Sequence, residues 1–324
     1  MTEPRLHHHV SQCYLKGFTQ EGTKDSQLYA VNLSDGSSFC TIPKNVGAER
    51  DFNRVEGRPP GEIERALSGF EGKVDAALRR IRQTRSIDNP KDWNAVLNLM
   101  ALFAVRNPRM RENVHTSIDH MSRIIMDMAL ATPERWESQV QRMKAAGAMK
   151  GEPRVGYDEL KKFHEEGNYN IEVSIALHIA QEFKIQDTIL RTMADRRWLL
   201  CSAKQDSGGF LTSDHPVCLM HSDGTPPTFQ RPIGHGMRNS TVIFPLGNEL
   251  LAVGTFEGSG GVRLLSPLQV AHMNGVVCAY AERQIYARDE TFRVWGGKKR
   301  GPMTSVELTR LLAVQDASAD QTSS

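Results

Sequence analysis

Three consecutive histidines near the start of the chain are the first residues whose types could support chemistry. His7, His8 and His9 follow the segment MTEPRL and run directly into an amphipathic stretch. Consecutive side chains point in different directions on a regular element, so three adjacent histidines do not easily share one metal ion. A turn of the backbone lets two of them share a site. We expect His7 and His8 to act as metal ligands or as a base, with a surface position of no function as the alternative.

A second candidate is the segment FLTSDHP, residues 210–216, at the end of a predicted strand. In a structural interpretation, Thr212, Ser213 and Asp214 cap backbone amides in a turn before the proline. In a functional interpretation, the turn holds Asp214 and His215 at a sheet end so that they face a cleft. Asp214 then ligates a metal or orients a histidine, and Thr212 and Ser213 contact the substrate.

Glu71 is the third candidate. Glu64 and Glu71 lie seven residues apart on a predicted helix and therefore share a face. Glu71 directly follows the apolar Phe70, at the boundary of the buried stripe. Most glutamates in such a place face solvent, and a catalytic role for Glu71 is the alternative.

Two groups of arginines lie at predicted helix ends. Their default role is a solvated face, where positive charge at a helix C-terminus also complements the helix dipole. Guanidinium groups match phosphate geometry, however, so arginines beside a histidine pair also suit a phosphate-bearing ligand. The first group is Arg79, Arg80, Arg82 and Arg85, and the second is Arg106, Arg109 and Arg111 around Asn107 and Pro108.

Several widespread catalytic motifs are absent from the sequence. It contains no GxxxxGK[ST] loop, no GxGxxG after a strand, no HExxH and no GxSxG. Cys13 stands close to the histidines, which leaves a cysteine nucleophile as a minor alternative.

Composition predicts a globular protein of the cytoplasm. The 324 residues carry a formal net charge of +2, 39% are hydrophobic, and no apolar run is long enough to span a bilayer. The N-terminus lacks the apolar core of a secretory signal. Five scattered cysteines without CxxC spacing indicate reduced thiols. A net charge this close to zero argues neither for nor against nucleic acid as a binding partner.

The order of patterns predicts an α+β fold. Residues 28–42 suggest an N-terminal β-hairpin, followed by a central multi-helix region whose apolar residues recur at spacings of three and four. From residue 197, short apolar runs between Gly and Pro suggest a C-terminal antiparallel sheet, with a closing helix at 270–287. The two β parts are candidates for one sheet.

These patterns predict a single domain over residues 1–316. Its subregions are a β-rich part at 1–56, a helical part at 62–196 and a sheet with a helix at 197–316. The polar residues 317–324 are expected to form a disordered tail.

These pieces together resemble a bacterial family known as domain of unknown function 4238, whose members open with a pattern like HHxVPxxYLxxF. The chain has HHHVSQCYLKGF at 7–18, with His9 where Tyr is frequent and Ser11 where Pro is usual. Asn45 to Phe52 is similar to its N-x-x-x-E-x-D-F segment, and residues 103–109 to its helix ending near R-[TN]-P. Phe70 and Glu71 match a hydrophobic-Glu step, residues 211–216 match TSDxP, and 244–246 match a second strand motif. The resemblance spans roughly residues 7–290 and implies no established activity. It favours roles for His7, His8, Asp214 and Glu71.

The leading hypothesis is a metal-dependent phosphodiesterase or nuclease that acts in bacterial stress or phage defence. His7, His8 and Asp214 would hold Mn²⁺, Mg²⁺ or Zn²⁺, with Glu71 as a further catalytic residue. Arg106, Arg109, Asn45, Thr212 and Ser213 would contact nucleic acid or a phosphorylated small molecule. A variant is a ββα-metal nuclease in which Asp51 replaces a histidine.

Two alternatives stay open. One is a non-enzymatic sensor module that binds a ligand or a partner, in which the TSDHP turn is only a structural corner. The other is a metal-free hydrolase or transferase with His8 as general base. The metal mechanism requires His7 or His8, Asp214 and Glu71 to converge within a few ångströms.

Overall fold

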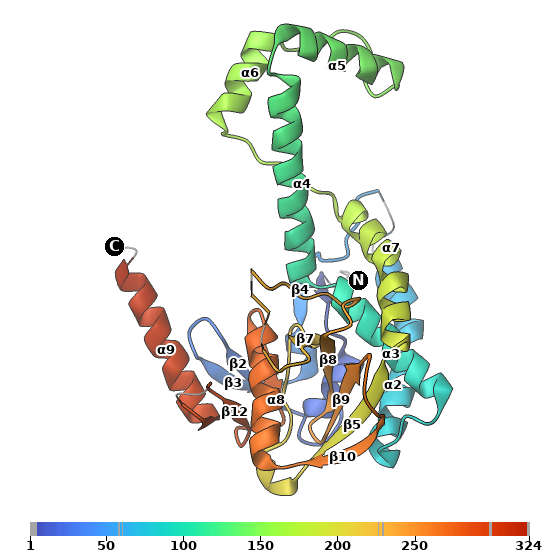
Figure 1. Ribbon diagram of the computed structural model, residues 1–324, viewed down its shortest axis with the longest axis vertical. Coiled ribbons are helices and arrows are strands. Elements are labelled where there is room, and N and C mark those ends of the chain that lie inside the picture. Colours follow the sequence, from blue (N-terminus) through green and yellow to red (C-terminus); the bar gives the residue numbers. More distant parts are fainter. Residues whose placement is uncertain are drawn as a thin grey trace. The chain divides into compact units, whose positions relative to one another are not determined.

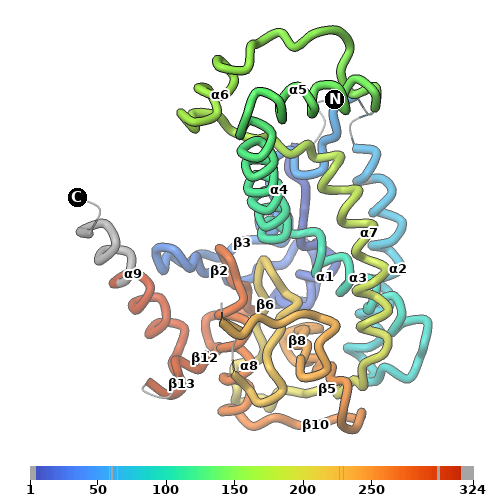
Figure 2. The backbone as a smooth tube through the Cα atoms, turned by 45° about the horizontal axis from the view of Figure 1, so that its top comes forward, coloured from blue at the N-terminus to red at the C-terminus, as the bar shows by residue number. Residues whose placement is uncertain are grey.

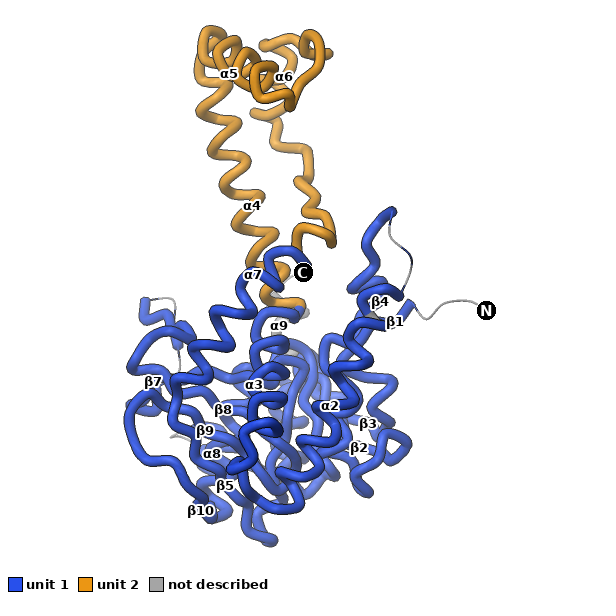
Figure 3. The backbone as a smooth tube through the Cα atoms, turned by 90° about the vertical axis from the view of Figure 1, so that its right-hand side faces the viewer, with its two compact units in different colours: residues 1–107, 179–324 blue, residues 108–178 orange. Residues whose placement is uncertain are grey.

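The computed structural model describes residues 5–57, 59, 61–225, 227–228, 230–297 and 300–322. The chain divides into two compact units (Figure 3). Unit 1 comprises Met1–Asn107 and Ile179–Ser324, and unit 2 comprises Pro108–His178. Neither hydrophobic core cluster of the described residues contains a side chain from 108–178, and the central helices are divided between the two units. The single domain over 1–316 stays a prediction from the sequence.

The helices follow the apolar periodicities of the sequence at most positions. They are α1 (Gln12–Leu15), α2 (Glu62–Thr84), α3 (Pro90–Val105), α4 (Pro108–Ala129), α5 (Pro133–Ala145), α6 (Tyr157–Glu166), α7 (Ile175–Ala194), α8 (Pro267–Tyr280) and α9 (Ser305–Thr322), with short 3₁₀ turns η1 (Lys16–Phe18), η2 (Pro43–Asn45) and η3 (Gln205–Ser207).

The strands form two larger sheets and two short ribbons. They are β1 (Leu6–His8), β2 (Leu28–Asn32), β3 (Ser38–Thr41), β4 (Ala48–Arg50), β5 (Arg197–Ala203), β6 (Thr212–Ser213), β7 (Cys218–His221), β8 (Ser240–Gly247), β9 (Leu250–Thr255), β10 (Gly261–Leu265), β11 (Gln284–Ala287), β12 (Arg293–Trp295) and β13 (Pro302–Thr304). The mixed α/β fold with an N-terminal hairpin, a C-terminal sheet and a closing helix is therefore as predicted.

The five-stranded sheet, in the order β10-β5-β9-β8-β7, has a hydrophobic core on each face. Along β8, Val242 and Phe244 belong to the core that includes α2 and α3, and Ile243 belongs to the core that includes α8. Side chains alternate between the faces of a strand, so a strand buried on both faces reads as a continuous apolar run. Figures 1 and 2 show α8 on one side of the sheet and α2 with α3 on the other. One pairing departs from the predicted antiparallel pattern, because β10 runs parallel to β5.

The four-stranded sheet, in the order β3-β2-β11-β6, joins distant parts of the chain. The predicted hairpin forms β2 and β3, and β11 pairs antiparallel with both β2 and β6. The sequence predicted a helix to residue 287, but α8 ends at Tyr280 and Gln284–Ala287 form a strand. Ile285 and Ala287 are buried in the core that includes α8, and Tyr286 is buried in the core that includes α2 and α3. Burial on both faces favours a strand here over the helix predicted from local periodicity.

The disordered tail at 317–324 stays a prediction from the sequence: α9 is assigned as Ser305–Thr322, and residues 323–324 lie outside the described part. Leu308 of α9 is buried in the α8 core cluster, which anchors the start of that helix to unit 1. Helical hydrogen bonding then propagates from the anchored turn, since adding a residue to an existing helix costs less than starting one.

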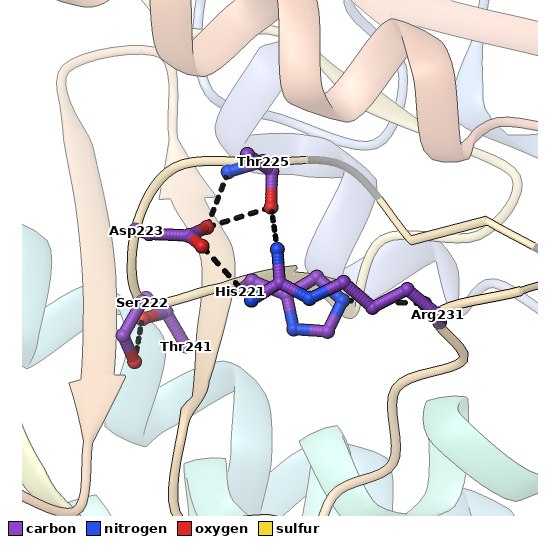
Figure 4. A network of polar contacts seen from close by, with 6 residues as sticks. All are labelled: His221, Ser222, Asp223, Thr225, Arg231 and Thr241. Carbon is purple, nitrogen blue, oxygen red and sulfur yellow. Dashed lines mark hydrogen bonds and ion pairs between the residues drawn. The ribbon is translucent and has the colours of Figure 1, made fainter.

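The connection between β7 and β8 is held by its own polar network (Figure 4). Arg231 forms an ion pair with Asp223 at 2.9 Å and donates to the Thr225 hydroxyl at 2.7 Å. Thr225 also donates to Asp223, and these bonds lower the pKa of the Asp223 carboxyl. His221 contacts the Arg231 carbonyl at 3.2 Å. These contacts stabilise the loop.

Arg196, two residues after the end of α7, connects the same loop to β9. Its guanidinium donates to the carbonyl oxygens of Ser240, Gly254 and His235 at 2.6–3.1 Å and to the Ser240 hydroxyl. It also lies 4.2 Å from the ring centroid of Phe256. Burial lowers the pKa of Arg196 to about 10, so the group stays cationic at neutral pH.

We expect unit 1 to lose stability as the pH falls from about 6.5 to about 4, because of His235. Burial, with the Arg196 charge second, lowers the pKa of His235 from 6.5 to about 4. Over that window the unfolded chain binds a proton that the folded chain does not, so acid favours unfolding, by about 3 kcal/mol at most. Urea unfolding of wild type and His235→Gln at pH 7 and pH 4.5 measures the effect.

The variant should lose less stability between these two pH values than the wild type does. Exposed His272 supplies the control, since His272→Gln should keep the wild-type pH dependence. An equal pH dependence in His235→Gln and wild type would show that other groups cause the acid sensitivity.

Candidate functional site

The paired histidines lie on β1, which pairs with β4, and both contact the backbone. His7 Nδ1 accepts a hydrogen bond from the Asn53 amide at 2.9 Å, and the residue is 7% exposed. His8 Nε2 lies 3.2 Å from the Lys44 carbonyl oxygen. Since a carbonyl only accepts, His8 Nε2 carries the proton in this contact. Each histidine thus has one ring nitrogen engaged in holding the N-terminal strand to residues 44–53.

Arg106, predicted to bind substrate, is buried and contacts the N-terminal part of the chain. It donates to the His8 carbonyl at 3.2 Å and to Asn53 Oδ1 at 3.3 Å, and its guanidinium lies 5.8 Å from the Phe52 ring centroid. At 6% exposure it joins α3 to β1 and the segment after β4. Arg109 belongs to α4 of unit 2.

The TSDHP turn is fully engaged in the four-stranded sheet. Thr212 Oγ1 lies 2.7 Å from the Tyr14 hydroxyl, and Ser213 Oγ accepts from the His215 amide at 3.1 Å. Asp214 Oδ1 accepts from the Glu282 amide at 2.9 Å. Its Oδ2 accepts from the next two amides, of Arg283 and Gln284, at 2.7 and 3.2 Å. The Asp214 carboxylate therefore caps the start of β11, the role that the structural interpretation of the turn assigned to it.

Glu71 lies on α2, close to Cys13 rather than among the residues that surround Asp214. Burial raises the pKa of the Cys13 thiol to about 11, and the negative charges of Glu71 and Asp75 act in the same direction. A thiol with that pKa is protonated at neutral pH, and the thiolate is the nucleophilic form. The environment of Cys13 thus opposes the role of nucleophile.

A pocket of about 740 Å³ at the edge of the four-stranded sheet brings some of the predicted residues together. We call it the His9–Asp214 pocket. Asn45 and Asp214 line it, together with His9, the third residue of the histidine triplet, and His7 and His8 are not among its lining residues. The Asn45 side-chain NH₂ group donates to the Thr41 hydroxyl at 3.0 Å. This bond does not use the Asn45 side-chain oxygen, which can accept a hydrogen bond from another group.

The amide and phenol groups of this pocket form a chain of hydrogen bonds. Gln284 donates to Asn32 Oδ1 at 2.7 Å and accepts from the Tyr286 hydroxyl at 3.0 Å. Burial, with the Asp214 charge second, raises the pKa of Tyr286, so that its phenol stays protonated. The floor of the pocket is thereby a fixed, uncharged polar surface.

The formal charge of the pocket lining is −1 with His9 neutral. Asp214 and Glu282 contribute two carboxylates, and Arg283 contributes one guanidinium. Arg283 also forms an ion pair with Glu49 at 2.6 Å. The electrostatics therefore favour a neutral or positively charged occupant over a phosphate.

No group of three histidine, cysteine, aspartate or glutamate side chains suited to a metal ion occurs among the described residues. The set His7, His8 and Asp214 thus stays a prediction from the sequence without support from the geometry. The metal mechanism requires these residues to converge with Glu71. In the described contacts, the two histidines bond to residues within 44–53, whereas Asp214 bonds to residues 282–284.

The pocket residues that sequence reasoning missed include His9, Glu282, Gln284 and Tyr286. Three of them were hidden because residues 282–286 lay in the predicted closing helix. Gln284, Tyr286 and their neighbours do contain a signal, since Gln-Ile-Tyr-Ala alternates polar or aromatic with aliphatic residues as a strand does.

The fold and the site define a mixed α/β protein with a polar pocket at a sheet edge. In the described part of the chain, no helix is long and apolar enough to cross a membrane. The chain belongs to the family described as "Protein of unknown function (DUF4238)", whose model matches residues 6–291. Neither a curated protein nor a solved structure matches the chain.

Proposed function

We propose that this protein is a ligand-binding module whose His9–Asp214 pocket holds a small polar molecule, neutral or positively charged. The observation that carries the proposal is the pocket of about 740 Å³, lined by amide, phenol, imidazole and carboxylate groups. Its volume lies within the range of small-molecule sites, roughly 300–1,000 Å³.

Binding rather than hydrolysis is supported by the state of the predicted catalytic groups. Both Asp214 oxygens accept backbone hydrogen bonds, and a carboxylate used in this way stabilises a turn. His7 Nδ1 is likewise occupied by a backbone amide. A general base needs a ring nitrogen directed at the proton that it abstracts. These contacts support our choice of the binding module among the hypotheses from the sequence.

The pocket offers both hydrogen-bond acceptors and donors to a ligand. The Asn45 side-chain carbonyl and the negative lining favour a ligand with amino or hydroxyl groups. Nucleosides, free amino acids, polyamines and monosaccharides carry such groups, and they form the panel for a first screen.

Thermal unfolding of the full chain with each panel member at millimolar concentration tests the proposal. A ligand at a hundredfold excess over its Kd stabilises the folded state by about 2.7 kcal/mol, which appears as a raised Tm. Ser34→Trp places an indole at an exposed position of the pocket rim and should abolish the shift. Ser38→Trp, exposed on β3 but outside the pocket, is the matched control and should retain it.

Hydrolysis of bis(p-nitrophenyl) phosphate with Mn²⁺ or Mg²⁺, measured on the same preparations, distinguishes the predicted nuclease. Metal-dependent turnover that disappears in His8→Ala, with the fold retained, would contradict the binding module and restore the phosphodiesterase hypothesis. Absence of any Tm shift across the panel, or a shift that survives Ser34→Trp unchanged, would contradict the assignment of this pocket.

A further inference from the structure

A second pocket of unit 1 has the opposite charge. It has a volume of about 310 Å³ and lies where the end of α2, the turn η1 and the β8–β9 connection meet. Arg79, Arg82 and Arg85 of the first arginine cluster line it, with Lys16 and Arg288 from two other parts of the chain. We call it the basic pocket.

The positive charge of the basic pocket exceeds what its own carboxylates neutralise. Five cationic side chains and two carboxylates, Asp75 and Glu249, line it, so the formal charge is +3. Lys16 pairs with Asp75 at 2.6 Å and Arg85 with Glu249 at 2.8 Å. The Arg85 and Glu249 side chains are 51% and 62% exposed, and an ion pair that exposed contributes little to stability. An incoming anion can therefore replace Glu249 as the partner of Arg85.

Arg79 adds a cation without an ion-pair partner within the described part of the chain. It is exposed on the last turns of α2 and lines the same hollow. Because Lys16, Arg85 and Arg288 each have an acidic partner, Arg79 and Arg82 account for most of the surplus charge.

Arg82 is held rigidly at the base of the pocket. Its guanidinium donates to the backbone carbonyls of Leu246 and Tyr14, so no carboxylate neutralises it there. A Cβ atom on Gly17 would lie 2.3 Å from Arg82 Nη2, and one on Gly247 would lie 3.0 Å from Nε. The guanidinium is thus packed between two glycines. Burial lowers the pKa of Arg82 to about 10, and a nearby anion would offset that cost.

We propose that the basic pocket binds the phosphate groups of a phosphorylated small molecule. Guanidinium groups donate to phosphate oxygens in a matching planar geometry, and Lys16 adds a point charge. The five cations come from three separate segments and converge on one small hollow rather than lining a long stripe. That arrangement fits one or two phosphates better than the backbone of a nucleic acid, which needs contacts repeated along its length. The site is independent of the His9–Asp214 pocket and of its ligand.

Calorimetric titration of the full chain with pyrophosphate at low ionic strength tests this site, because screening by salt weakens exposed charges. The wild type should bind, and Arg79→Glu should weaken binding about tenfold or more, since it replaces an attraction by a repulsion. Arg191→Glu is the matched control, an equal change of charge on an exposed arginine near the end of α7 that does not line the pocket. It should change the affinity less than about threefold.

The titration has distinct outcomes for and against phosphate binding in the basic pocket. No heat of binding in the wild type, or equal loss in Arg79→Glu and Arg191→Glu, would overturn the proposal. So would a single-stranded oligonucleotide without terminal phosphates that displaces pyrophosphate and binds more tightly, because nucleic acid would then be the occupant. Circular dichroism of each variant excludes unfolding as the cause, and the result does not depend on the panel screen of the other pocket.

Discussion

Asp214→Asn is expected to destabilise unit 1 by about 2–4 kcal/mol. The carboxylate accepts three backbone hydrogen bonds at the start of β11, and hydrogen bonds to a charged group contribute about 1.5–3 kcal/mol each. In asparagine, an NH₂ group takes the place of one carboxylate oxygen. This NH₂ group is a donor and would face the N–H donors of the backbone. Since Asp214 is 7% exposed, water cannot easily compensate. Urea unfolding at pH 7 gives the free energy.

Asp35→Asn is the control for this prediction. Asp35 accepts from the Ser37 amide at 2.8 Å in an exposed turn, so its replacement should cost less than about 1 kcal/mol. An Asp214→Asn protein as stable as wild type would show that the three contacts do not carry the stability assigned to them. If that variant also lost a bound metal or an activity, Asp214 would be a functional residue, as the sequence first suggested.

Arg196→Met is expected to cost about 3 kcal/mol. The substitution keeps most of the aliphatic stem but leaves three buried carbonyl oxygens and the Ser240 hydroxyl without their donor. It also removes the cation from above Phe256. Arg196→Lys should recover only part of the loss, because an ammonium cannot reproduce the planar donor geometry of guanidinium.

The adjacent Arg197 provides a closely matched control. It is exposed at the start of β5, so Arg197→Met should change the free energy of unfolding by less than about 0.5 kcal/mol. Tryptophan fluorescence follows the urea transition, since Trp93 and Trp198 pack with ring centroids 5.1 Å apart in the core of unit 1. Equal effects of the two substitutions would refute a special role of the buried arginine.

Three of the segments through which the chain resembles its family contact one another in this structure. Tyr14, in the N-terminal motif, is fully buried and contacts the Thr212 hydroxyl of the TSDHP turn at 2.7 Å. It also donates to the Pro245 carbonyl, within the second strand motif at 244–246, at 2.8 Å. Three motifs separated by up to 231 residues thus meet at one phenol. A motif of this kind identifies a fold, and it does not by itself identify a reaction.

The sequence by itself determined the elements whose patterns are local. The stripe of apolar residues along α2 is read from spacing alone. The hairpin of β2 and β3 is similarly local, because its turn residues lie between its strands. The arginine cluster at the end of α2 was also visible, but its partners Lys16 and Arg288 were not.

Only the tertiary structure decided the identity of β11, the division into two units and the composition of both pockets. Residues 284–287 become a strand because β2 and β6, which are remote in sequence, supply hydrogen bonds on both sides. Long-range pairing of this kind overrides the local preference of a short segment. The same pairing brings Asp214 to residues 282–284 and places His9, rather than His7 or His8, at its pocket. Spacing along the chain specifies side-chain direction within one element, whereas proximity between elements depends on how their apolar faces pack.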